Sequence, residues 1–390
     1  MQESTTNDYD LLILGGGISG LAVAELASIK GIKTGIVEAS QPGQQTSNNT
    51  LRIIHGGFRY LQQLNLPRVI QSLRDQNYVY KRFTPHVTPL PCIMPLSKWG
   101  LKSRYPVAIA NTLYGTMMRC FSSKLSTPKI LSATKLKNLS PALPIDAPHG
   151  ALTWHDLVMT NPQGITDDLV SSLTHNGAIV HSNTTAQSIR PCPGGYEVLT
   201  NSGKILRAKK LINTLGPWIQ SVTKPETLAT PTRQWCQGIN IVVNKQLHPT
   251  HAIGLQSNEG RLFFCVPRGE HTAVGTWYVP HDEPTQATAT SKNAPCEETL
   301  TTFLHAFNRT ISRYSGSTLG EASYSLSLTD IVSVDSGILP MKHVGSAGPE
   351  LYGDAILTTH GSYCEVLSTK YTTFYSQAGR IVRSIGAVKL

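Results

Sequence analysis

The spacing of apolar residues near the N-terminus predicts a strand, a helix and a second strand in quick succession. Leu11 to Leu14 form a short apolar run, of the length typical of a fully buried parallel strand. Apolar residues at helical spacing follow from Leu21 to Ala27, and Thr34 to Val37 form a second strand-like run. This order indicates a β-α-β unit, from which doubly wound sheets are built.

Three glycines occupy the turn between the first strand and the helix. Gly15, Gly17 and Gly20 have GxGxxG spacing, which gives a tight turn, close approach of backbone to a pyrophosphate, and close packing of helix on strand. The helix N-terminus also attracts phosphate. Glu38 ends the second strand, where an acid accepts hydrogen bonds from ribose hydroxyls and repels a 2′-phosphate. These residues predict a dinucleotide site rather than a glycine-rich turn of another α/β protein. Their spacing does not distinguish FAD from NAD.

The rest of the chain alternates between helical and strand-like patterns. Helices are expected at 66–83, 106–121, 161–174, 300–308 and 363–376. Strands are expected at 88–96, 150–155, 178–181, 184–189, 196–200, 204–207, 211–214, 238–243, 261–267, 272–275, 333–340 and 351–358.

Composition and charge narrow the class of protein. The chain is 40% hydrophobic and 15% charged, as expected for a globular protein with ample core. Its net charge of +10 favours anionic partners. No dense basic tract with interleaved aromatic residues is present, which argues against a nucleic-acid partner. The seven scattered cysteines contain no CxxC, so we expect free thiols in a reducing compartment and no metal site. The polar N-terminus is unlike a signal peptide, so a cytoplasmic location is expected.

Residues 46–61, TSNNTLRIIHGGFRYL, resemble the flavin-contacting segment of the FAD-dependent glycerol-3-phosphate dehydrogenases, members of the D-amino-acid-oxidase-like superfamily. The family pattern is approximately T-S-S-x-S-S-K-L-I-H-G-G-x-R-Y-L. Arg52 stands where the family has lysine, and the matching residues are Thr46, Ser47, Ile54, His55, Gly56, Gly57, Arg59, Tyr60 and Leu61. Residues 215–218 (LGPW) resemble the family's turn beside the FAD pyrophosphate. The resemblance covers about residues 9–380 and implies FAD as the cofactor.

The resemblance also implies a fold: a doubly wound, Rossmann-type FAD domain interleaved with an α+β substrate domain of mostly antiparallel sheet. We assign residues 1–85, 150–228 and 331–390 to the FAD domain, and residues 86–149 and 229–330 to the substrate domain. The residues expected to bind the cofactor are Gly15, Gly17, Ser19, Gly20, Glu38, Ala39, Thr46, Ser47, Arg52, His55, Gly56, Gly57, Ala186, Gly216, Trp218, Gly337, Gly361 and Ser362.

Four residues are candidates for the chemistry of hydride transfer. Arg59 and Tyr60 match positions that contact the substrate or its phosphate in the family, and an arginine fork pairs well with phosphate or carboxylate. His55 is expected either to touch flavin or substrate or to bond its own loop. His360 precedes the helix predicted at 363–376, where it either polarises flavin, accepts a proton or caps the turn.

Three departures from the family concern the substrate. The family's substrate-side histidine aligns with Asn240, and an arginine aligns with Leu339. The family's G-G-K-x-T-T turn was aligned with residues 360–365, which lack its lysine. The sequence therefore predicts an FAD-dependent dehydrogenase or oxidase that acts on a CH–OH or CH–NH group of a small anionic substrate other than glycerol 3-phosphate. The alternatives are an amine or amino-acid oxidase and a non-catalytic flavin-binding subunit. The electron acceptor is oxygen, a quinone or another molecule.

The helix predicted at 106–121 is apolar and has basic neighbours on both sides, Lys98, Lys102, Arg104, Arg119 and Lys124. One interpretation is a helix lying on a membrane surface, which would place the protein on the cytoplasmic face. The favoured interpretation is an ordinary helix of the substrate domain, because the family has a helix here too.

Overall fold

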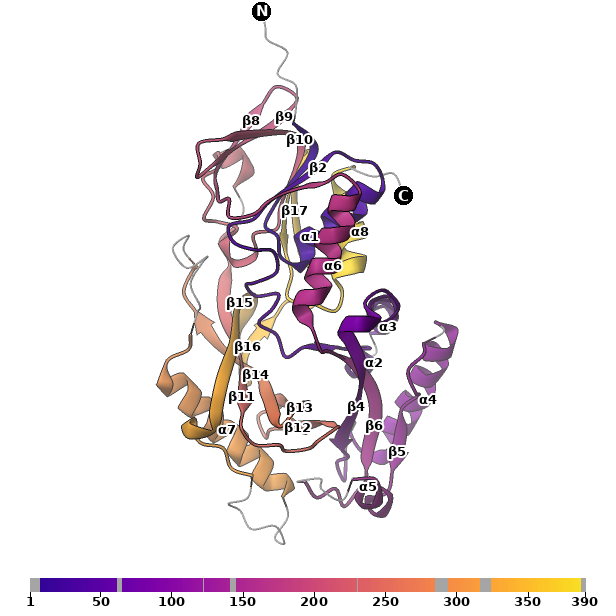
Figure 1. Ribbon diagram of the computed structural model, residues 1–390. Coiled ribbons are helices and arrows are strands. Elements are labelled where there is room, and N and C mark those ends of the chain that lie inside the picture. Colours follow the sequence, from indigo (N-terminus) through magenta and orange to yellow (C-terminus); the bar gives the residue numbers. More distant parts are fainter. Residues whose placement is uncertain are drawn as a thin grey trace, which may run out of the picture.

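The computed structural model describes residues 8–61, 65–121, 123–140, 145–229, 231–284, 294–315 and 324–386. Two sheets dominate it, one above the other in Figure 1. The upper sheet contains β1 (Tyr9–Leu14), β2 (Thr34–Val37), β7 (Ile179–His181), β8 (Ala186–Cys192), β9 (Gly195–Thr200), β10 (Ile205–Asn213), β17 (Ile356–His360) and β18 (Tyr363–Leu367).

The centre of the upper sheet is parallel. Strand β1 pairs with β2 on one side and with β10 on the other, and the parallel pairing continues to β7 and β18. Alternate residues of β1 face opposite sides: Leu11 and Ile13 join one core cluster, and Leu12 and Leu14 join another. Since every residue of β2 is also buried, both faces of this sheet are covered.

The two faces are covered differently. Helices α1 (Ile18–Ile29), α6 (Pro162–His175) and α8 (Phe374–Ser384) lie together on the face of Leu11 and Ile13. On the other face, β8, β9 and the following turns cover Leu12 and Leu14. The mixed α/β class predicted from the sequence is confirmed, but within the described residues the second face carries a strand hairpin in place of helices.

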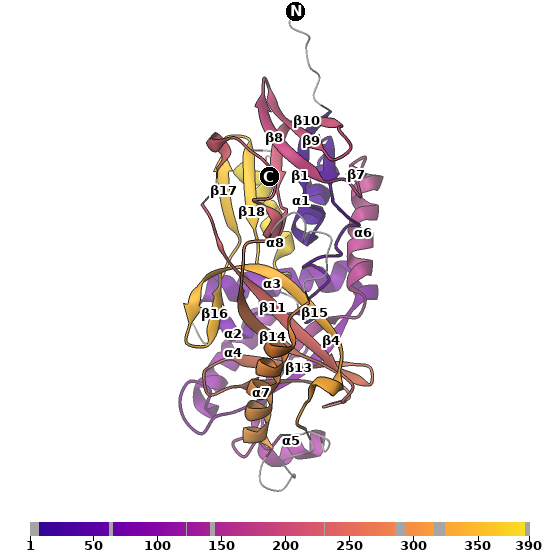
Figure 2. The same cartoon turned by 90° about the vertical axis from the view of Figure 1, so that its left-hand side faces the viewer.

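The lower sheet is antiparallel except where β12 meets β4. Its strands are β3 (Ile53–Ile54), β4 (Val87–Pro95), β5 (Lys129–Leu131), β6 (Ala151–Met159), β11 (Gln234–Val243), β12 (Ala252–Gln256), β13 (Leu262–Arg268), β14 (His271–His281), β15 (Ile331–Gly345) and β16 (Gly348–Leu351). Figure 2 shows β11, β14 and β15 beneath the upper sheet, with α7 (Glu297–Tyr314) against them.

Four other helices complete the description of the lower half. The short α2 (Phe58–Leu61) and the longer α3 (Leu66–Arg82) lie between the two sheets, while α4 (Arg104–Cys120) and α5 (Ala133–Leu139) flank β4 and β6 (Figure 1). Among the residues that the structure describes, no helix is both long and apolar enough to cross a membrane.

Two segments that were assigned to the FAD domain contribute strands to the lower sheet. Strand β6 and the hairpin of β15 and β16 belong to the lower sheet, through pairing with β4 and β11. Residues 151–159 and 331–351 were expected in the FAD domain. Strand pairing between distant segments decides which sheet a strand joins, and the local pattern does not contain that information.

The prediction of a helix at 363–376 is wrong. Residues Tyr363–Leu367 form β18, all five of them buried, and the helix begins only at Phe374. A short apolar run between turns fits either a buried strand or a buried helix, and here pairing with β10 makes it a strand.

Candidate active site

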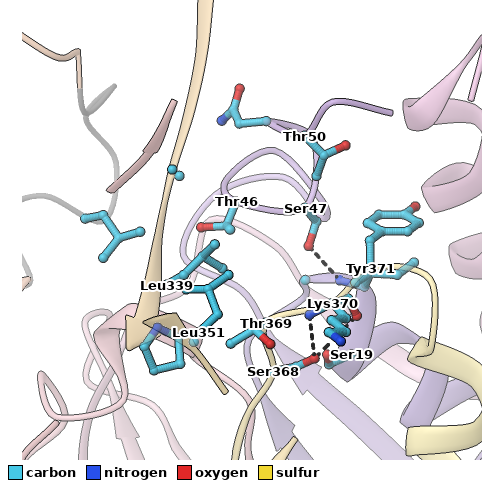
Figure 3. Close-up of a pocket in the computed structure, with 18 of the residues that line it drawn as sticks. Ser19, Thr46, Ser47, Thr50, Leu339, Leu351, Ser368, Thr369, Lys370 and Tyr371 are labelled. Atoms are coloured by element: carbon cyan, nitrogen blue, oxygen red, sulfur yellow. Dashed lines mark hydrogen bonds between the residues drawn. The ribbon is translucent and has the colours of Figure 1, made fainter. Parts of the chain in front are cut away.

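A cavity of about 980 Å³ lies where the two sheets meet. Its walls come from the turns after β1, β2, β10 and β18, which are parallel strands, and from β11, β13, β14 and β15 of the lower sheet. Ligands of α/β proteins bind outside the carboxyl ends of such strands. In Figure 3, Leu339 and Leu351 lie on one side of the cavity, and Ser19, Lys370 and Tyr371 lie on the other.

The glycine turn after β1 leaves no room for larger side chains. Gly15 has φ +97°, and a Cβ there would lie 2.6 Å from the Thr214 carbonyl oxygen. A Cβ on Gly20 would lie 2.0 Å from the Gly15 carbonyl oxygen, because α1 packs directly on the turn. Gly17 is the N-cap of α1, without a side-chain cap, and it lines the cavity with Ser19. The turn therefore presents backbone and a helix N-terminus to the cavity, as pyrophosphate binding requires.

Glu38 lies at the end of β2 and lines the cavity. Its carboxylate accepts hydrogen bonds from the Gly16 N–H at 2.7 Å and from the Ser40 N–H at 2.9 Å. These bonds hold the acid beside the glycine turn. Ala39 and Ala186 also line the cavity.

The segment that carries the family resemblance crosses the middle of the cavity. Ser47 accepts a hydrogen bond from the Ile18 N–H at 3.0 Å, which joins this segment to the start of α1. Thr46 packs against Gly337 of β15, where a Cβ would lie 2.9 Å from the Thr46 methyl group. Gly216 and Trp218, in the short turn Gly216–Trp218, also line the cavity.

His55 is held by a fully buried carboxylate. Its Nδ1 lies 2.8 Å from Asp156 Oδ2, and Asp156 also accepts bonds from the Gly56 N–H at 2.8 Å, Trp154 Nε1 at 3.1 Å and Gln76 Nε2 at 3.3 Å. Burial raises the pKa of Asp156, but these partners outweigh it, so that the pKa lies below its ordinary value. An ionised carboxylate only accepts hydrogen bonds, so it holds the His55 proton on Nδ1.

A cationic wall lies beside Tyr60. The Lys370 ammonium donates a hydrogen bond to the Tyr60 hydroxyl and lies 4.4 Å from the centre of its ring. The Arg68 guanidinium carbon lies 5.3 Å from the centre of the same ring. Arg68 Nε and Nη2 are buried and have no hydrogen-bond partner within the described part of the chain. Two cations at one aromatic ring form a place where an anion is stabilised.

Most predicted cofactor residues line this one cavity. They are Gly15, Gly17, Ser19, Glu38, Ala39, Thr46, Ser47, His55, Gly57, Ala186, Gly216, Trp218 and Gly337, and the predicted substrate residue Tyr60 joins them. Gly20 and Gly56 lie directly behind the lining. A Cβ on Gly56 would lie 2.2 Å from the Tyr114 hydroxyl. Arg59 belongs to α2, but its side chain lies outside the described residues.

Two predicted parts of the site lie elsewhere. Arg52 has φ +65° and is not among the lining residues; the charges of Arg268 and Asp335 act on it instead. His360 ends β17, Gly361 and Ser362 form the turn to β18, and none of the three is among the lining residues. The carboxyl end of β18 leads into the cavity, so this turn lies at the other end of the strand. The five residues of β18 separate the two ends by about 16 Å.

The loop that does enter the cavity is Ser368 to Thr373, STKYTT. Its residues 370–373 match the K-x-T-T part of the family's G-G-K-x-T-T turn, eight residues after the position expected from the sequence. A lysine followed after one residue by two threonines is the signal that could have found it. One of the three departures therefore disappears, since Lys370 supplies the lysine. Asn240 and Leu339 remain, and both line the cavity.

The glycine turn, the acid after β2 and the cavity between two sheets define a dinucleotide-dependent oxidoreductase. A family model described as "FAD dependent oxidoreductase" (DAO) matches residues 10–322. The alpha-glycerophosphate oxidase of Streptococcus pyogenes serotype M1 is 27% identical over 291 residues, which cover 71% of this chain and 47% of that protein. This chain thus spans about half the length of that relative.

Two solved structures share the fold. The glycerol-3-phosphate dehydrogenase from Bacillus halodurans, complexed with FAD, has a TM-score of 0.68 at 19% identity, over 98% of this chain and 65% of that chain. Glycine oxidase from Geobacillus kaustophilus has a TM-score of 0.65 at 15% identity, over 97% and 95%. The chain belongs to the DAO family of FAD-dependent oxidoreductases, and FAD is its cofactor. The closed glycine turn and the helix N-terminus at the cavity fit the FAD pyrophosphate.

Proposed function

We propose that the protein oxidises a small anionic substrate by hydride transfer from a CH–OH or CH–NH carbon to FAD. One observation carries this proposal: His55, held by Asp156, and the cation Lys370 line the same cavity. The backbone N–H of His55 donates a hydrogen bond to Thr372 Oγ1 at 3.3 Å, and Lys370 lies two residues before Thr372 in the chain. When bound, FAD accepts the hydride.

His55 is the proposed proton acceptor. Oxidation of an alcohol releases the hydroxyl proton as well as the hydride, and a neutral imidazole accepts it if one nitrogen is unprotonated. Because Asp156 holds the proton on Nδ1, Nε2 carries the lone pair. The His55 side chain is 46% exposed and lines the cavity, so a substrate can reach it.

The anion is proposed to bind at Lys370, which lines the cavity. Arg68 adds positive charge at the same Tyr60 ring, but it is not among the lining residues and its charge also acts on Asp354. A phosphate or a carboxylate supplies several charge-assisted acceptors at once. Because Lys370 matches the lysine of the family's turn, glycerol 3-phosphate is again a candidate substrate.

A second candidate function is oxidation of an amino acid or amine. It is favoured by Asn240 and Leu339, which stand where the glycerol-3-phosphate dehydrogenases have a histidine and an arginine. Asn240 is buried, and its Oδ1 accepts a hydrogen bond from the Thr276 hydroxyl at 2.8 Å. An amide there cannot accept a proton at neutral pH. A carboxylate substrate would use the same cationic wall.

The test is an anaerobic visible spectrum of the FAD-loaded protein, with glycerol 3-phosphate, a panel of 2-hydroxy acids and a panel of amino acids. We expect loss of the oxidised flavin band near ~450 nm with one of these classes. Lys370→Met should weaken that substrate's binding, whereas Lys209→Met, in an exposed ion pair with Asp10, should not. A flavin that no member of the panels reduces would contradict the proposal and favour a non-catalytic flavin-binding subunit.

The electron acceptor is proposed to be oxygen or a quinone. Mixing substrate-reduced protein with oxygenated buffer or with a water-soluble quinone separates the two by the rate at which the oxidised band returns. A quinone acceptor would suit a protein held at the cytoplasmic face of a membrane, because quinones dissolve in the lipid.

A further inference from the structure

The positive charge of the chain is concentrated in one segment. Residues 76–145 contain ten lysines and arginines and no aspartate or glutamate. The remainder of the chain holds 24 basic and 24 acidic residues, so this segment carries the entire net charge of +10. The segment includes β4, α4, β5 and α5, which Figure 1 shows along the outer edge of the lower half.

Large apolar side chains are exposed in the middle of this basic segment. Trp99, Leu101, Tyr105, Ile109 and Leu113 have exposed fractions of 79%, 71%, 82%, 74% and 41%. They come from the loop before α4 and from the first three turns of the helix. We refer to these five residues as the apolar face. Lys98 lies beside it, with its ammonium 5.8 Å from the centre of the Trp99 ring.

The apolar face is not the core-facing side of α4. That side consists of Val107, Tyr114 and Met118, each at most 2% exposed. The outward side of a helix on a water-soluble protein normally carries charged residues. From Tyr105 to Met118, α4 has no charged residue at all, while basic residues stand immediately outside these limits and acidic ones do not. The outward side is therefore suited to an apolar partner with negative charge around it.

We propose that the apolar face binds the surface of an anionic lipid membrane. An exposed tryptophan and tyrosine together with aliphatic side chains suit the boundary between headgroups and acyl chains. The surrounding lysines and arginines suit anionic headgroups, which attract basic residues close to such a surface. A protein partner would require complementary acidic contacts around a shaped groove, whereas here the exposed residues follow one outer helix and its preceding loop.

This position also connects the surface to the active site. Lys102, in the loop that carries Trp99 and Leu101, lines the cavity together with Met94 of β4. A membrane bound to the apolar face would therefore lie close to the wall of the cavity. The proposal does not depend on the substrate, because it rests on exposure and charge alone.

The experiment is flotation of the FAD-loaded protein with vesicles of phosphatidylcholine containing phosphatidylglycerol, and with vesicles of phosphatidylcholine only. We expect flotation with the anionic vesicles, and its loss at ~1 M salt, where the screening length falls to about 3 Å. The variant Tyr105→Ser/Ile109→Ser should partition at least roughly tenfold less, because burial of one isoleucine contributes more than a factor of ten.

The matched control is Val332→Ser/Val344→Ser, which removes two apolar side chains that are 55% and 56% exposed on β15. It should float like the unaltered protein, and the flavin spectrum of each variant reports that it is folded. The proposal is overturned if the protein does not float with anionic vesicles, if both vesicle types capture it equally, or if the Tyr105→Ser/Ile109→Ser variant floats unchanged. A dimer that this variant converts to monomer, without vesicle binding, would instead make the apolar face an interface between two copies.

Discussion

Asp156→Asn is the substitution that most directly tests how His55 is held. The four hydrogen-bond donors around Asp156 all face acceptor oxygens. Asparagine keeps one of those oxygens and replaces the other with an NH₂ group, which only donates. If the NH₂ group replaces Oδ2, Trp154 Nε1 loses its acceptor and His55 must accept at Nδ1, which moves its own proton to Nε2.

Two magnitudes follow from this geometry. A buried donor left without an acceptor costs about 1–3 kcal/mol, so the free energy of unfolding should fall by that amount. An Nε2 that carries a proton cannot act as a base, and loss of a general base lowers a rate by about 10²–10⁴-fold. Binding of FAD should be retained, because Asp156 belongs to β6 of the lower sheet, whereas the glycine turn follows β1 of the upper sheet.

The assay is stopped-flow reduction of the flavin under anaerobic conditions, with the substrate that reduces the unaltered protein. Asp75→Asn is the matched control: it removes the charge of another buried aspartate, 1% exposed, whose partner Ser376 lies on α8. We expect slow reduction only in Asp156→Asn. If that variant reduces flavin at the unaltered rate with an unaltered pH profile, His55 is not the proton acceptor.

Three further predictions concern the cofactor, the anion and the stability of the fold. Gly20→Val should yield protein without bound flavin, measured by its absorbance spectrum, because its Cβ would overlap the Gly15 carbonyl. Gly379→Val, where a Cβ would lie 4.0 Å from the nearest atom, in the Arg383 side chain, should perturb flavin binding far less, and equal loss in both would contradict the packing argument. Lys370→Met should raise the KM more than it lowers kcat, with glycerol 3-phosphate or the best panel substrate, and an unchanged KM would remove this lysine from the anion site. Burial raises the pKa of Asp75 to about 6, so its contribution to stability is present below pH ~4 and is lost as the pH rises through about 6. Asp75→Asn should therefore flatten the dependence of Tm on pH in this window, and an unaltered slope there would refute the shift.

The sequence predicts best what is encoded locally. The strand, glycine turn, helix and acid between Tyr9 and Glu38 follow one another directly, and the structure places them as expected. Most of the segment from Thr46 to Tyr60 also lines the cavity, although Arg52 does not. In both cases the spacing of residues within a single unit determines the geometry.

The sequence predicts poorly what depends on distant pairing. Asp156 meets His55 across 101 residues, and no local pattern marks that aspartate as its partner. Tyr363–Leu367 is an apolar run whose strand character comes from β10 beside it. A helix at this position would place its preceding turn, residues 360–362, at the cavity. As a strand, the run instead leads into the cavity at its carboxyl end, where Lys370 lies.

The interleaved order of the elements has a consequence for biosynthesis. The upper sheet takes β1 and β2 from the start of the chain and β17 and β18 from its end, and the cavity is closed by residues 368–373. During translation the glycine turn emerges first, but the opposite wall of the cavity leaves the ribosome only after more than 360 residues have been made. The complete cofactor site therefore forms only after residues 368–373 have been made. Until then, the last residues of β10 lack their partner β18, and the face of Leu11 and Ile13 lacks the cover of α8. An unpaired strand edge and an exposed apolar face are features that favour aggregation of a nascent chain.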